Sequence, residues 1–334
     1  MHQAQSGAGG PVDSQGKLII DGVTPVILVC GEALIDLVPG PTGTELAYLA
    51  RPGGSSFNVA IGLGRLGAPV GFLGRVSTDR FGRMLRGRLE TDGVDCRLVT
   101  SGDEPTTIAV VQIEAAEPAY VFYGEGTADR LFGLDGPPPA FPDEVTVLHF
   151  GSISLVREPG ASAFEAVMRR EYGRRVLTLA PNVRPRLTGA RAGYLARLEG
   201  WVSLAGVVKV SCADLAWLYP ESTPDAVAAE WLALGPNLVV ATRGRDGCFG
   251  VTHRDRVEIP GIPVVVSDTV GAGDAFTSGL LAWLHAAGQL ERGSIREIQV
   301  DTLANALEFA NRVAAVTCTR TGAQPPTRSE LASF

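Results

Sequence analysis

The sequence has few of the residues that build disulfide-bonded, zinc-binding or nucleic-acid-binding proteins. Its five cysteines are far apart with no C-x-x-C pair, and its four histidines are also scattered. This spacing argues against a disulfide framework or a zinc site and favours reduced thiols in a cytoplasmic protein. The formal net charge of −7 argues against nucleic acid or an anionic membrane surface as the main partner.

Lysine is almost absent. Lys17 and Lys209 are the only two, and neither stands in a G-x-x-x-x-G-K-[ST] motif. This excludes a P-loop that holds phosphates with a lysine. Any phosphate chemistry in this protein is therefore expected to use backbone N–H groups, arginine or a metal ion.

Long hydrophobic runs are also missing, and none reaches the length that spans a membrane. The first residues have neither a basic nor an apolar region, so residues 1–24 are predicted to be a flexible tail rather than a signal peptide. The remaining residues, 25–330, are long enough for one α/β domain with a sizeable core.

Short apolar runs alternate with helical periodicity along most of the chain. This alternation predicts an α/β fold with a mostly parallel sheet and helices on both faces. The predicted strands are 26–30, 145–150, 176–180, 207–210 and 238–242, and the predicted helices are 57–66, 81–92, 161–172, 226–234, 274–287 and 302–317. Two stretches with strand patterns, 41–52 and 105–126, interrupt the alternation and are predicted to form a small separate sheet.

Residues 62–67 read GLGRLG, which formally matches the dinucleotide-binding pattern G-x-G-x-x-G. These glycines come late in a helical pattern that starts after Ser55 or Ser56, both good N-cap residues. A dinucleotide fingerprint instead follows a strand and opens a helix. Gly67, with Pro69 soon after, is typical of a helix C-terminus. The pattern therefore disfavours hydride transfer with a dinucleotide.

The stretch DTVGAGDAFTSGLLAWL, residues 268–284, places three small residues, Gly271 to Gly273, before a helical pattern. Free N–H groups at a helix N-terminus bind anions and stabilise the charge of a transferred phosphoryl group. The next residue, Asp274, is suited to accept a proton from a hydroxyl that attacks this phosphoryl group. Taken alone, the spacing equally allows Asp274 to be a simple capping carboxylate.

The same stretch resembles the C-terminal signature of the PfkB family of carbohydrate kinases, the ribokinase-like kinases. RPGGSSFNVAIGLGRLGAPVGFLGRVSTDRFG, residues 51–82, resembles the N-terminal signature of that family, and the likeness extends from residue 26 to about residue 327. The resemblance implies a Rossmann-like, three-layer α/β/α fold with a small β-sheet lid from about 41–52 and 105–126. It also implies that Gly271, Ala272 and Gly273 form the anion hole and that Asp274 is the catalytic base.

Four further positions match residues that bind the sugar in this family. Asp36 lies among apolar residues in GEALIDLVP, where a buried carboxylate needs partners such as adjacent sugar hydroxyls. Gly53 and Gly54 permit a ligand to approach the backbone. Asn58 offers both a donor and an acceptor. Without the resemblance, Asp36 is more readily explained as an acid at a strand end or a turn.

Other positions match residues that bind ATP. TRGRDG, residues 242–247, resembles the nucleotide loop of the family. The ATP-binding residues that the resemblance implies are Asn182, Arg184, Thr242, Gly244, Gly247 and Asn311. For Asn311, an exposed position on the last long helix is almost as good an explanation.

The resemblance also implies metal ions as cofactors beside ATP. Asp214 stands where the family links an acidic residue to magnesium through water, and Asp268 and Thr269 stand where many members bind potassium. Two departures lie near this metal. Ala180 stands where the family commonly has an aspartate. Ser211 and Asp214 stand where the family has the asparagine and the glutamate of N-x-x-E, and the side chain of Asp214 is one methylene shorter than that of glutamate. We expect Mg²⁺ to be needed still, because the phosphate charges require neutralisation.

GEALIDLVP and FYGEGTADR, residues 122–130, look most like the bacterial fructokinase branch, which implies transfer of the γ-phosphate of ATP to C6 of D-fructose. Ribose, 2-keto-3-deoxygluconate and nucleosides remain alternative substrates. A non-catalytic protein that binds sugar and nucleotide is an alternative of another class. By analogy with lids that pair in this family, a homodimer is expected.

Overall fold

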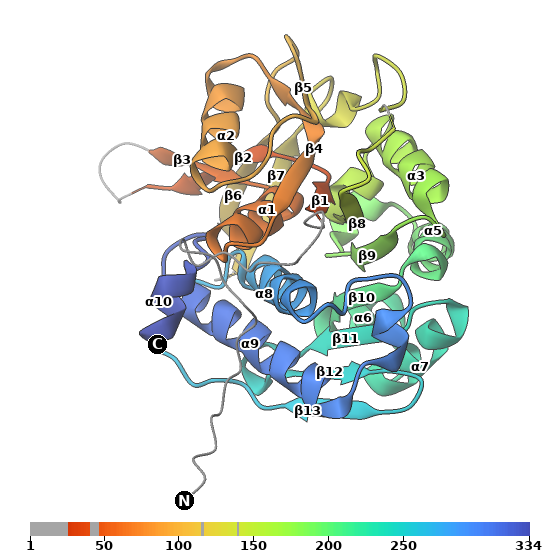
Figure 1. Cartoon of the computed structure of the whole chain (residues 1–334). Coiled ribbons are helices and arrows are strands. Elements are labelled where there is room, and N and C mark those ends of the chain that lie inside the picture. The colour runs from red at the N-terminus through yellow and green to blue at the C-terminus, as the bar shows by residue number, and fades with distance from the viewer. Residues whose placement is uncertain (1–25, 41–46, 115–116, 139) are drawn as a thin grey trace, which may run out of the picture.

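The computed structural model describes residues 26–40, 47–114, 117–138 and 140–334 (Figure 1). The predicted tail, residues 1–24, and residues 41–46 of the predicted small sheet lie outside the described residues. Within the described part of the chain, no helix is both long and apolar enough to cross a membrane.

A nine-stranded sheet forms the centre of the molecule. Seven neighbouring strands pair in parallel, and two antiparallel strands extend one edge. In spatial order the strands are β13 (Arg256–Ile259), β12 (Cys248–Val251), β11 (Leu238–Thr242), β10 (Val207–Ser211), β9 (Val176–Ala180), β8 (Val145–Gly151), β1 (Val26–Cys30), β4 (Val70–Ser77) and β5 (Val99–Gly102). The predicted strands are all present, whereas β4, β5, β12 and β13 were not predicted from the sequence.

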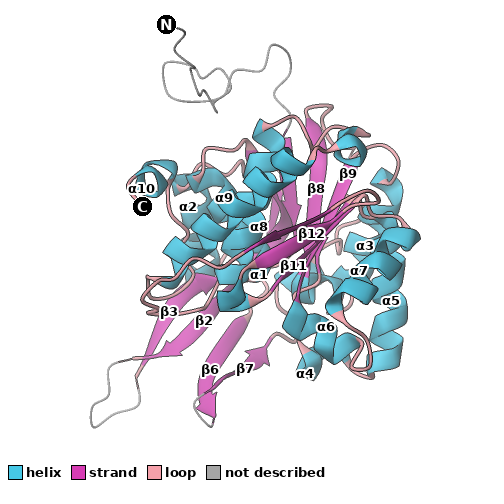
Figure 2. Cartoon of the chain, turned by 90° about the horizontal axis from the view of Figure 1, so that it is seen from below, coloured by secondary structure: helices cyan, strands magenta, loops and turns pink. Residues whose placement is uncertain are grey.

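Helices cover both faces of this sheet (Figure 2). Successive residues of β1 point to opposite cores, Ile27 and Val29 into one and Leu28 and Cys30 into the other. The first core is closed by α1 (Ser55–Arg65), α2 (Arg80–Thr91), α8 (Ala272–Ala286) and α9 (Val300–Cys318), and the second by α3 (Gly160–Glu171), α5 (Arg191–Leu204), α6 (Cys212–Leu218) and α7 (Pro224–Leu234). The predicted α/β/α layers are therefore confirmed.

A small four-stranded sheet projects from one side of the molecule (Figure 2). Its order is β3 (Tyr48–Gly53), β2 (Leu34–Pro39), β6 (Ile108–Glu114) and β7 (Glu117–Tyr123). The predicted segments 41–52 and 105–126 supply three of these strands, and β2 was missed. Only three residues separate β2 from β1, so the chain passes from the large sheet into the small one without a turn signal that the sequence would reveal. We call this four-stranded sheet the lid.

Candidate active site

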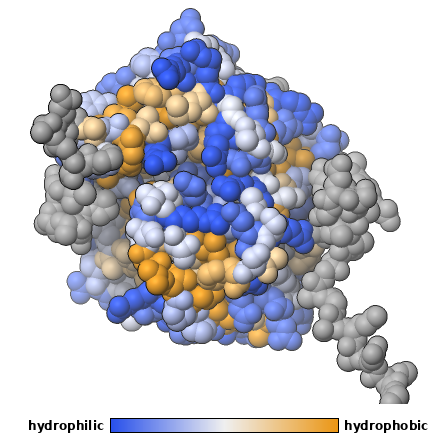
Figure 3. Space-filling view, turned by 90° about the vertical axis from the view of Figure 1, so that its left-hand side faces the viewer, coloured by the Kyte–Doolittle hydropathy of each residue, from blue (hydrophilic) through white to orange (hydrophobic). Residues whose placement is uncertain are grey.

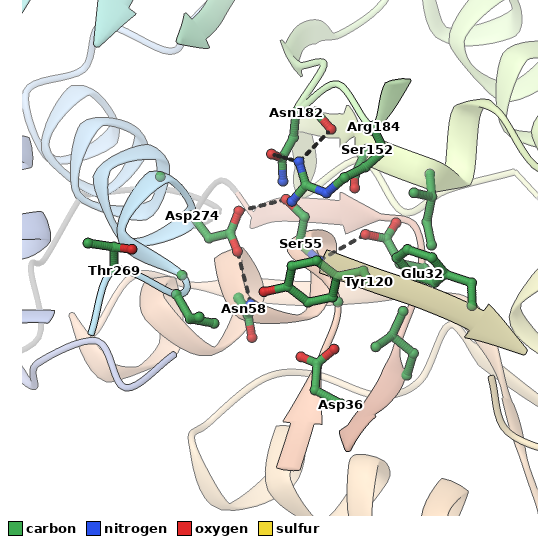
Figure 4. A pocket seen from close by; sticks show the side chains of 17 residues that line it. Glu32, Asp36, Ser55, Asn58, Tyr120, Ser152, Asn182, Arg184, Thr269 and Asp274 are labelled. Atoms are coloured by element: carbon green, nitrogen blue, oxygen red, sulfur yellow. Dashed lines mark hydrogen bonds between the residues drawn. The ribbon is translucent and has the colours of Figure 1, made fainter. Parts of the chain in front are cut away.

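A polar pocket of about 240 Å³ lies between the lid and the carboxyl edge of the large sheet. The segments that follow parallel strands meet at this edge, which is where α/β proteins bind their ligands. Its polar side chains come from the lid, from the segments after β1, β8 and β9, and from the N-terminal turns of α1 and α8; they are Glu32, Asp36, Ser55, Asn58, Tyr120, Ser152, Asn182, Arg184, Thr269 and Asp274 (Figure 4).

The Gly271–Asp274 turn opens helix α8 as predicted. Gly271 is the N-cap residue, with a φ of 76°, and a Cβ there would lie 2.4 Å from the Cβ of Ala323. Only glycine tolerates both conditions. Ala272 donates its N–H to the carbonyl of Thr269, at 3.2 Å. Among the described residues, the N–H groups of Gly273 and Asp274 have no acceptor, so they are free to bind an anion in the pocket.

The Asp274 carboxylate is held by two donors from helix α1. Ser55 Oγ donates to Oδ1 at 2.6 Å, and Asn58 Nδ2 donates to Oδ2 at 2.9 Å (Figure 4). Burial raises the pKa of Asp274, and these two hydrogen bonds oppose the rise. A carboxylate that is fixed in position and has a raised pKa is well suited to accept a proton. Asn58, which was expected to contact a sugar, lines the pocket but uses its amide to hold Asp274.

The N-cap interpretation of Ser55 and Ser56 is wrong. The N-cap of α1 is Gly54, with a φ of 105° and no side chain to cap the helix. The capping oxygen comes instead from Glu32, whose Oε1 accepts the N–H groups of Ser55 at 2.9 Å and of Ser56 at 3.3 Å. This frees the Ser55 hydroxyl for Asp274. The capping group is 23 residues away in the sequence, so no local pattern reveals it.

The glycines of GLGRLG allow α1 to pack closely on its neighbours. A Cβ on Gly62 would lie 2.3 Å from Ser278 Oγ of α8, and a Cβ on Gly64 would lie 2.1 Å from the carbonyl oxygen of Asp92. Gly67 lies beyond the helix end with a φ of 78°. Gly62 therefore lets α1 approach α8, so that Ser55 reaches Asp274, and Gly64 lets α1 approach the C-terminal end of α2. The rejection of a dinucleotide site agrees with this packing.

Asp36 approaches the pocket from the lid, across from Asp274 (Figure 4). Within the described part of the chain, its carboxylate has no hydrogen-bond partner. Burial, and then the nearby charge of Asp274, raise the pKa of Asp36 to about 7. An unpartnered carboxylate that faces a polar pocket is suited to accept hydrogen bonds from a ligand with hydroxyl groups.

Two residues with strained backbones also line the pocket. Ser152 and Asn182 have φ values of 57° and 43°, and they follow β8 and β9. Such strain is commonly found at functional sites. Asn182 Oδ1 accepts a hydrogen bond from Arg184 Nη1 at 2.7 Å, which directs the guanidinium into the pocket (Figure 4). Asn182 and Arg184 therefore lie in the same pocket as Asp36 and Asp274.

Four other residues expected to bind ATP lie outside the pocket lining: Thr242, Gly244 and Gly247 at and after the carboxyl end of β11, and Asn311 within α9. Thr242 ends β11 and pairs with Ser211, which ends β10. Asp214 lies in the first turn of α6, where its N–H is capped by Ser211 Oγ at 2.9 Å. The structure thus brings Thr242 and Asp214 to one edge, as a nucleotide site at this place would require.

The loop after Thr242 is a tight turn. Gly244 and Gly247 have φ values of 59° and 95°, and a Cβ on Gly247 would lie 2.1 Å from the carbonyl oxygen of Ile259. Asn311 is buried, and its amide donates to the carbonyl of Pro260 at 3.2 Å. The alternative that Asn311 is exposed on its helix is therefore wrong.

Asp268 and Thr269, which the resemblance assigns to a potassium site, differ in their surroundings. Both carboxylate oxygens of Asp268 accept backbone N–H groups, from Val270 at 3.0 Å and Gly322 at 2.8 Å, whereas Thr269 lines the pocket. No cluster of three His, Cys, Asp or Glu side chains that could hold a metal occurs in residues 26–40, 47–114, 117–138 and 140–334. The carboxylate of Asp214, in the first turn of α6, is a single acidic side chain of the kind that Mg²⁺ uses together with water and substrate phosphates.

Comparison with known proteins adds to this geometry. A family model described as pfkB family carbohydrate kinase matches residues 25–330. The chain is 38% identical over 281 residues to a protein named fructokinase from Rhizobium leguminosarum bv. trifolii, and the match covers 84% of this chain and 86% of that protein.

Two solved structures are similar over nearly the whole chain. A fructokinase with bound ATP from Xylella fastidiosa has a TM-score of 0.82 and 29% identity, covering 92% of this chain and 97% of that one. A fructokinase from Vibrio cholerae O395, in a form with fructose, ADP and calcium ion bound, has a TM-score of 0.81 and 29% identity, covering 94% of this chain and 99% of that one.

Proposed function

Because the chain belongs to the pfkB family of carbohydrate kinases and has their ribokinase-like fold, we propose that it is an ATP-dependent fructokinase. It transfers the γ-phosphate of ATP to the primary hydroxyl at C6 of D-fructose. One observation carries this proposal: the unpartnered carboxylate of Asp36 faces Asp274 across a polar pocket. The names of the relatives, and the fructose and ADP in the Vibrio cholerae structure, support it.

In this proposal, Asp36 binds the sugar. Its two oxygens accept hydrogen bonds from adjacent hydroxyl groups, which replace the water that burial removes. Gly53 and Gly54 allow the sugar to approach the backbone. The lid carries Asp36, so sugar binding and exclusion of water occur together, which favours transfer to the sugar over hydrolysis of ATP.

Asp274 is the general base. Its carboxylate takes the proton of the C6 hydroxyl as the oxygen forms a bond to the γ-phosphorus. The bond from this phosphorus to the oxygen between the β- and γ-phosphates breaks, and ADP leaves. The free N–H groups of Gly273 and Asp274, together with Arg184, stabilise the negative charge on the transferred group.

The phosphates and ribose of ATP are proposed to bind along Thr242, Gly244 and Gly247. Asn311 is proposed to lie beside the adenine ring. Asp214 would hold Mg²⁺ through water, and this ion neutralises phosphate charge when bound. Asp268 and Thr269 are proposed to order a potassium site. Since both Asp268 oxygens are bonded to backbone N–H groups, Asp268 is expected to shape that site rather than to ligate the ion.

The lid is also proposed to join two copies of the chain into a cytoplasmic homodimer. Tyr48, Leu49 and Tyr123 of the lid are exposed hydrophobic residues. On the side of the molecule that carries β2 and β3, hydrophobic patches stand beside hydrophilic ones (Figure 3). Pairing of lids would cover part of this surface.

The experiment that tests the function is ATP turnover over a panel of D-fructose, D-ribose, 2-keto-3-deoxygluconate and adenosine, with Mg²⁺ and potassium. We expect D-fructose to give the highest kcat/KM and excess chelator to abolish turnover. A higher kcat/KM with another member of the panel would show that this compound, and not D-fructose, is the preferred substrate. Thermal stabilisation by a sugar without ATP consumption would favour the non-catalytic binding protein.

Gly53→Ala is expected to raise the KM for fructose by about 10- to 100-fold, because overpacking forces neighbouring groups to move. A Cβ at Gly53 would lie 2.1 Å from Asp36 Oδ2, so the carboxylate must turn away from its position. Steady-state kinetics with varied fructose at saturating ATP measure this effect.

Gly87→Ala is the matched control. Gly87 lies within α2, and a Cβ there meets no atom within 4 Å. This change is expected to leave KM unchanged and to stabilise the helix by about 0.5–1 kcal/mol. An unchanged KM in Gly53→Ala would mean that Asp36 does not contact the sugar.

A further inference from the structure

A second cavity, of about 590 Å³, lies at the edge of the large sheet opposite to the active-site pocket. Its lining comes from the start of β8, from the C-terminal end of α3 and the turn before β9, and from residues 290–292 after α8. Each of β8, β9 and α8 has its other end at the active-site pocket. Since β8 has seven residues, the two cavities lie roughly 20 Å apart, at about 3.3 Å per residue. We call this second cavity the amino-edge cavity, and its size is typical of a site for a small molecule.

Two arginines on one wall of the amino-edge cavity are fixed in place. Glu171, which is 3% exposed, accepts a hydrogen bond from Arg170 Nε at 2.7 Å and another from Arg175 Nε at 2.9 Å. Both guanidinium groups also lie over the ring of Phe141, at 4.8 and 5.8 Å from its centre. We call Arg170 and Arg175 the fixed guanidinium pair. Since the pair carries two positive charges and Glu171 one negative charge, this wall keeps a positive charge in a defined position.

Two further arginines of the cavity, Arg174 and Arg292, are exposed. Their side chains form no hydrogen bond or ion pair with any other residue that the structure describes. Asp143 and Glu291 also line the cavity and are exposed, yet neither lies within ion-pair distance of these arginines. The cavity therefore offers free guanidinium groups, which suit a phosphate group, and free carboxylates, which suit hydroxyl groups.

Thr146 supplies a third kind of unsatisfied group. The pairing of β1 with β8 skips this residue, so it is an extra residue of β8, and such bulges redirect side chains. Thr146 lines the cavity, and its Oγ1 is buried without a hydrogen-bond partner among the described residues. A buried hydroxyl without a partner is costly, which is typical of a group that a ligand or a bound water satisfies.

We propose that the amino-edge cavity is a second ligand site, which binds a phosphorylated sugar. Arg174 and Arg292 bind the phosphate group beside the fixed guanidinium pair, and Asp143 and Glu291 accept hydrogen bonds from the sugar hydroxyls. Inorganic phosphate lacks these hydroxyls and a neutral sugar lacks the phosphate, so both bind less tightly. Because the cavity is at the opposite edge of the sheet from Asp274, its ligand does not compete with fructose or ATP.

Calorimetric titration of the native protein with D-glucose 6-phosphate, D-ribose 5-phosphate and D-fructose 1,6-bisphosphate tests this proposal. The titrations contain saturating D-fructose and the β,γ-methylene analogue of ATP with Mg²⁺, which fill the proposed active site. We expect at least one phosphosugar to bind, at one site per chain and at least about tenfold more tightly than inorganic phosphate or D-glucose. Absence of binding by all three phosphosugars would overturn the proposal, and so would equally tight binding of inorganic phosphate.

Arg174→Met and Arg292→Met locate the bound phosphosugar. Each change is expected to weaken its binding by about 10- to 100-fold, because a hydrogen bond between charged groups is lost. Neither side chain has a partner to lose, so the melting temperature without ligand is expected to stay the same. Arg169→Met is the matched control, because Arg169 is an exposed residue of α3 that pairs with Glu165 and does not line the cavity. We expect this control to bind the phosphosugar like the native protein, and native affinity in both Arg174→Met and Arg292→Met would overturn the proposal.

A second measurement uses the native protein, which keeps the test valid if a variant does not fold. Phenylglyoxal modifies accessible guanidinium groups, and mass spectrometry identifies each modified arginine. We expect the bound phosphosugar to protect Arg174 and Arg292, while labelling of Arg169 stays the same. Equal labelling of Arg174 and Arg292 with and without the phosphosugar would overturn the proposal. None of these measurements requires turnover, so their failure is distinct from a failure of the proposed kinase function.

Discussion

Asp274→Ala is expected to lower kcat with fructose by about 10³-fold, the range expected for loss of a general base. The carboxylate is fixed by Ser55 and Asn58 at the edge of the free N–H groups of α8. The KM for fructose should change little, because Asp36 and the backbone near Gly53 remain. Steady-state kinetics at saturating ATP measure both quantities.

Asp301→Ala separates catalysis from a capping effect. Asp301 lies in the first turn of α9, as Asp274 lies in the first turn of α8, but it is exposed. If Asp274 only stabilised the helix dipole, both changes would cost similar stability and little activity. We expect Asp301→Ala to keep full activity. A kcat of Asp274→Ala near the native value would show that another group accepts the proton.

The stability of Asp274→Asn gives an independent check. Burial raises the folded-state pKa of Asp274, so the ionised group destabilises the folded protein at neutral pH. The amide removes this charge and should not lower the melting temperature. Loss of activity in a variant that melts no earlier than the native protein therefore cannot be attributed to unfolding.

The second large expected effect is a pH dependence of kcat/KM for fructose that is caused by Asp36. The pKa of Asp36 in the protein without ligand is about 7, and the ionised carboxylate is the form that accepts two hydroxyl hydrogen bonds. We expect kcat/KM for fructose to rise as the pH increases towards about 7 and then to level off. Below that point it should fall by up to about tenfold per pH unit, because the protonated form accumulates. Measurements of kcat/KM between pH 5.5 and 8.5 test this, since the parameter reports the free enzyme.

Asp36→Asn should lower kcat/KM at pH 8 by about 10²-fold, because a hydrogen bond to a charged group is lost. The step near pH 7 should disappear with it, leaving only the pH dependence of Asp274. An identical pH profile in this variant would assign the step to another group. The stability of the native protein relative to the variant should decrease as the pH rises to about 7, since the raised pKa means that ionised Asp36 opposes folding.

The sequence by itself determined the features that depend on neighbouring residues. Alternation of apolar runs and helical periodicity identified the parallel strands and the helices on both faces. The glycines around Asp274 identified the turn at the start of α8, because a free helix N-terminus and a positive φ are local properties. The two long signatures identified the family, and the comparisons confirm it.

Predictions from local sequence patterns were wrong where a side chain forms its hydrogen bonds with residues far away in the sequence. Ser55 and Ser56 have the chemistry of N-cap residues, yet the α1 N-terminus is capped by Glu32. Strand β2 was missed because it follows β1 after three residues. The alternative explanation of Asp36 as an acid at a strand end or a turn is therefore wrong, because Asp36 lies within β2.

Only the tertiary structure decided which charged groups meet. Packing of α1 on α8 brings Ser55 and Asn58 to a carboxylate more than 200 residues away in the sequence. Parallel strand order places Lys209 next to Gly273, with its Nζ 3.2 Å from the position that a Cβ of this glycine would take. The physical reason is that burial and electrostatic interaction depend on distance in space, and this distance is set by the packing of the layers rather than by position in the sequence.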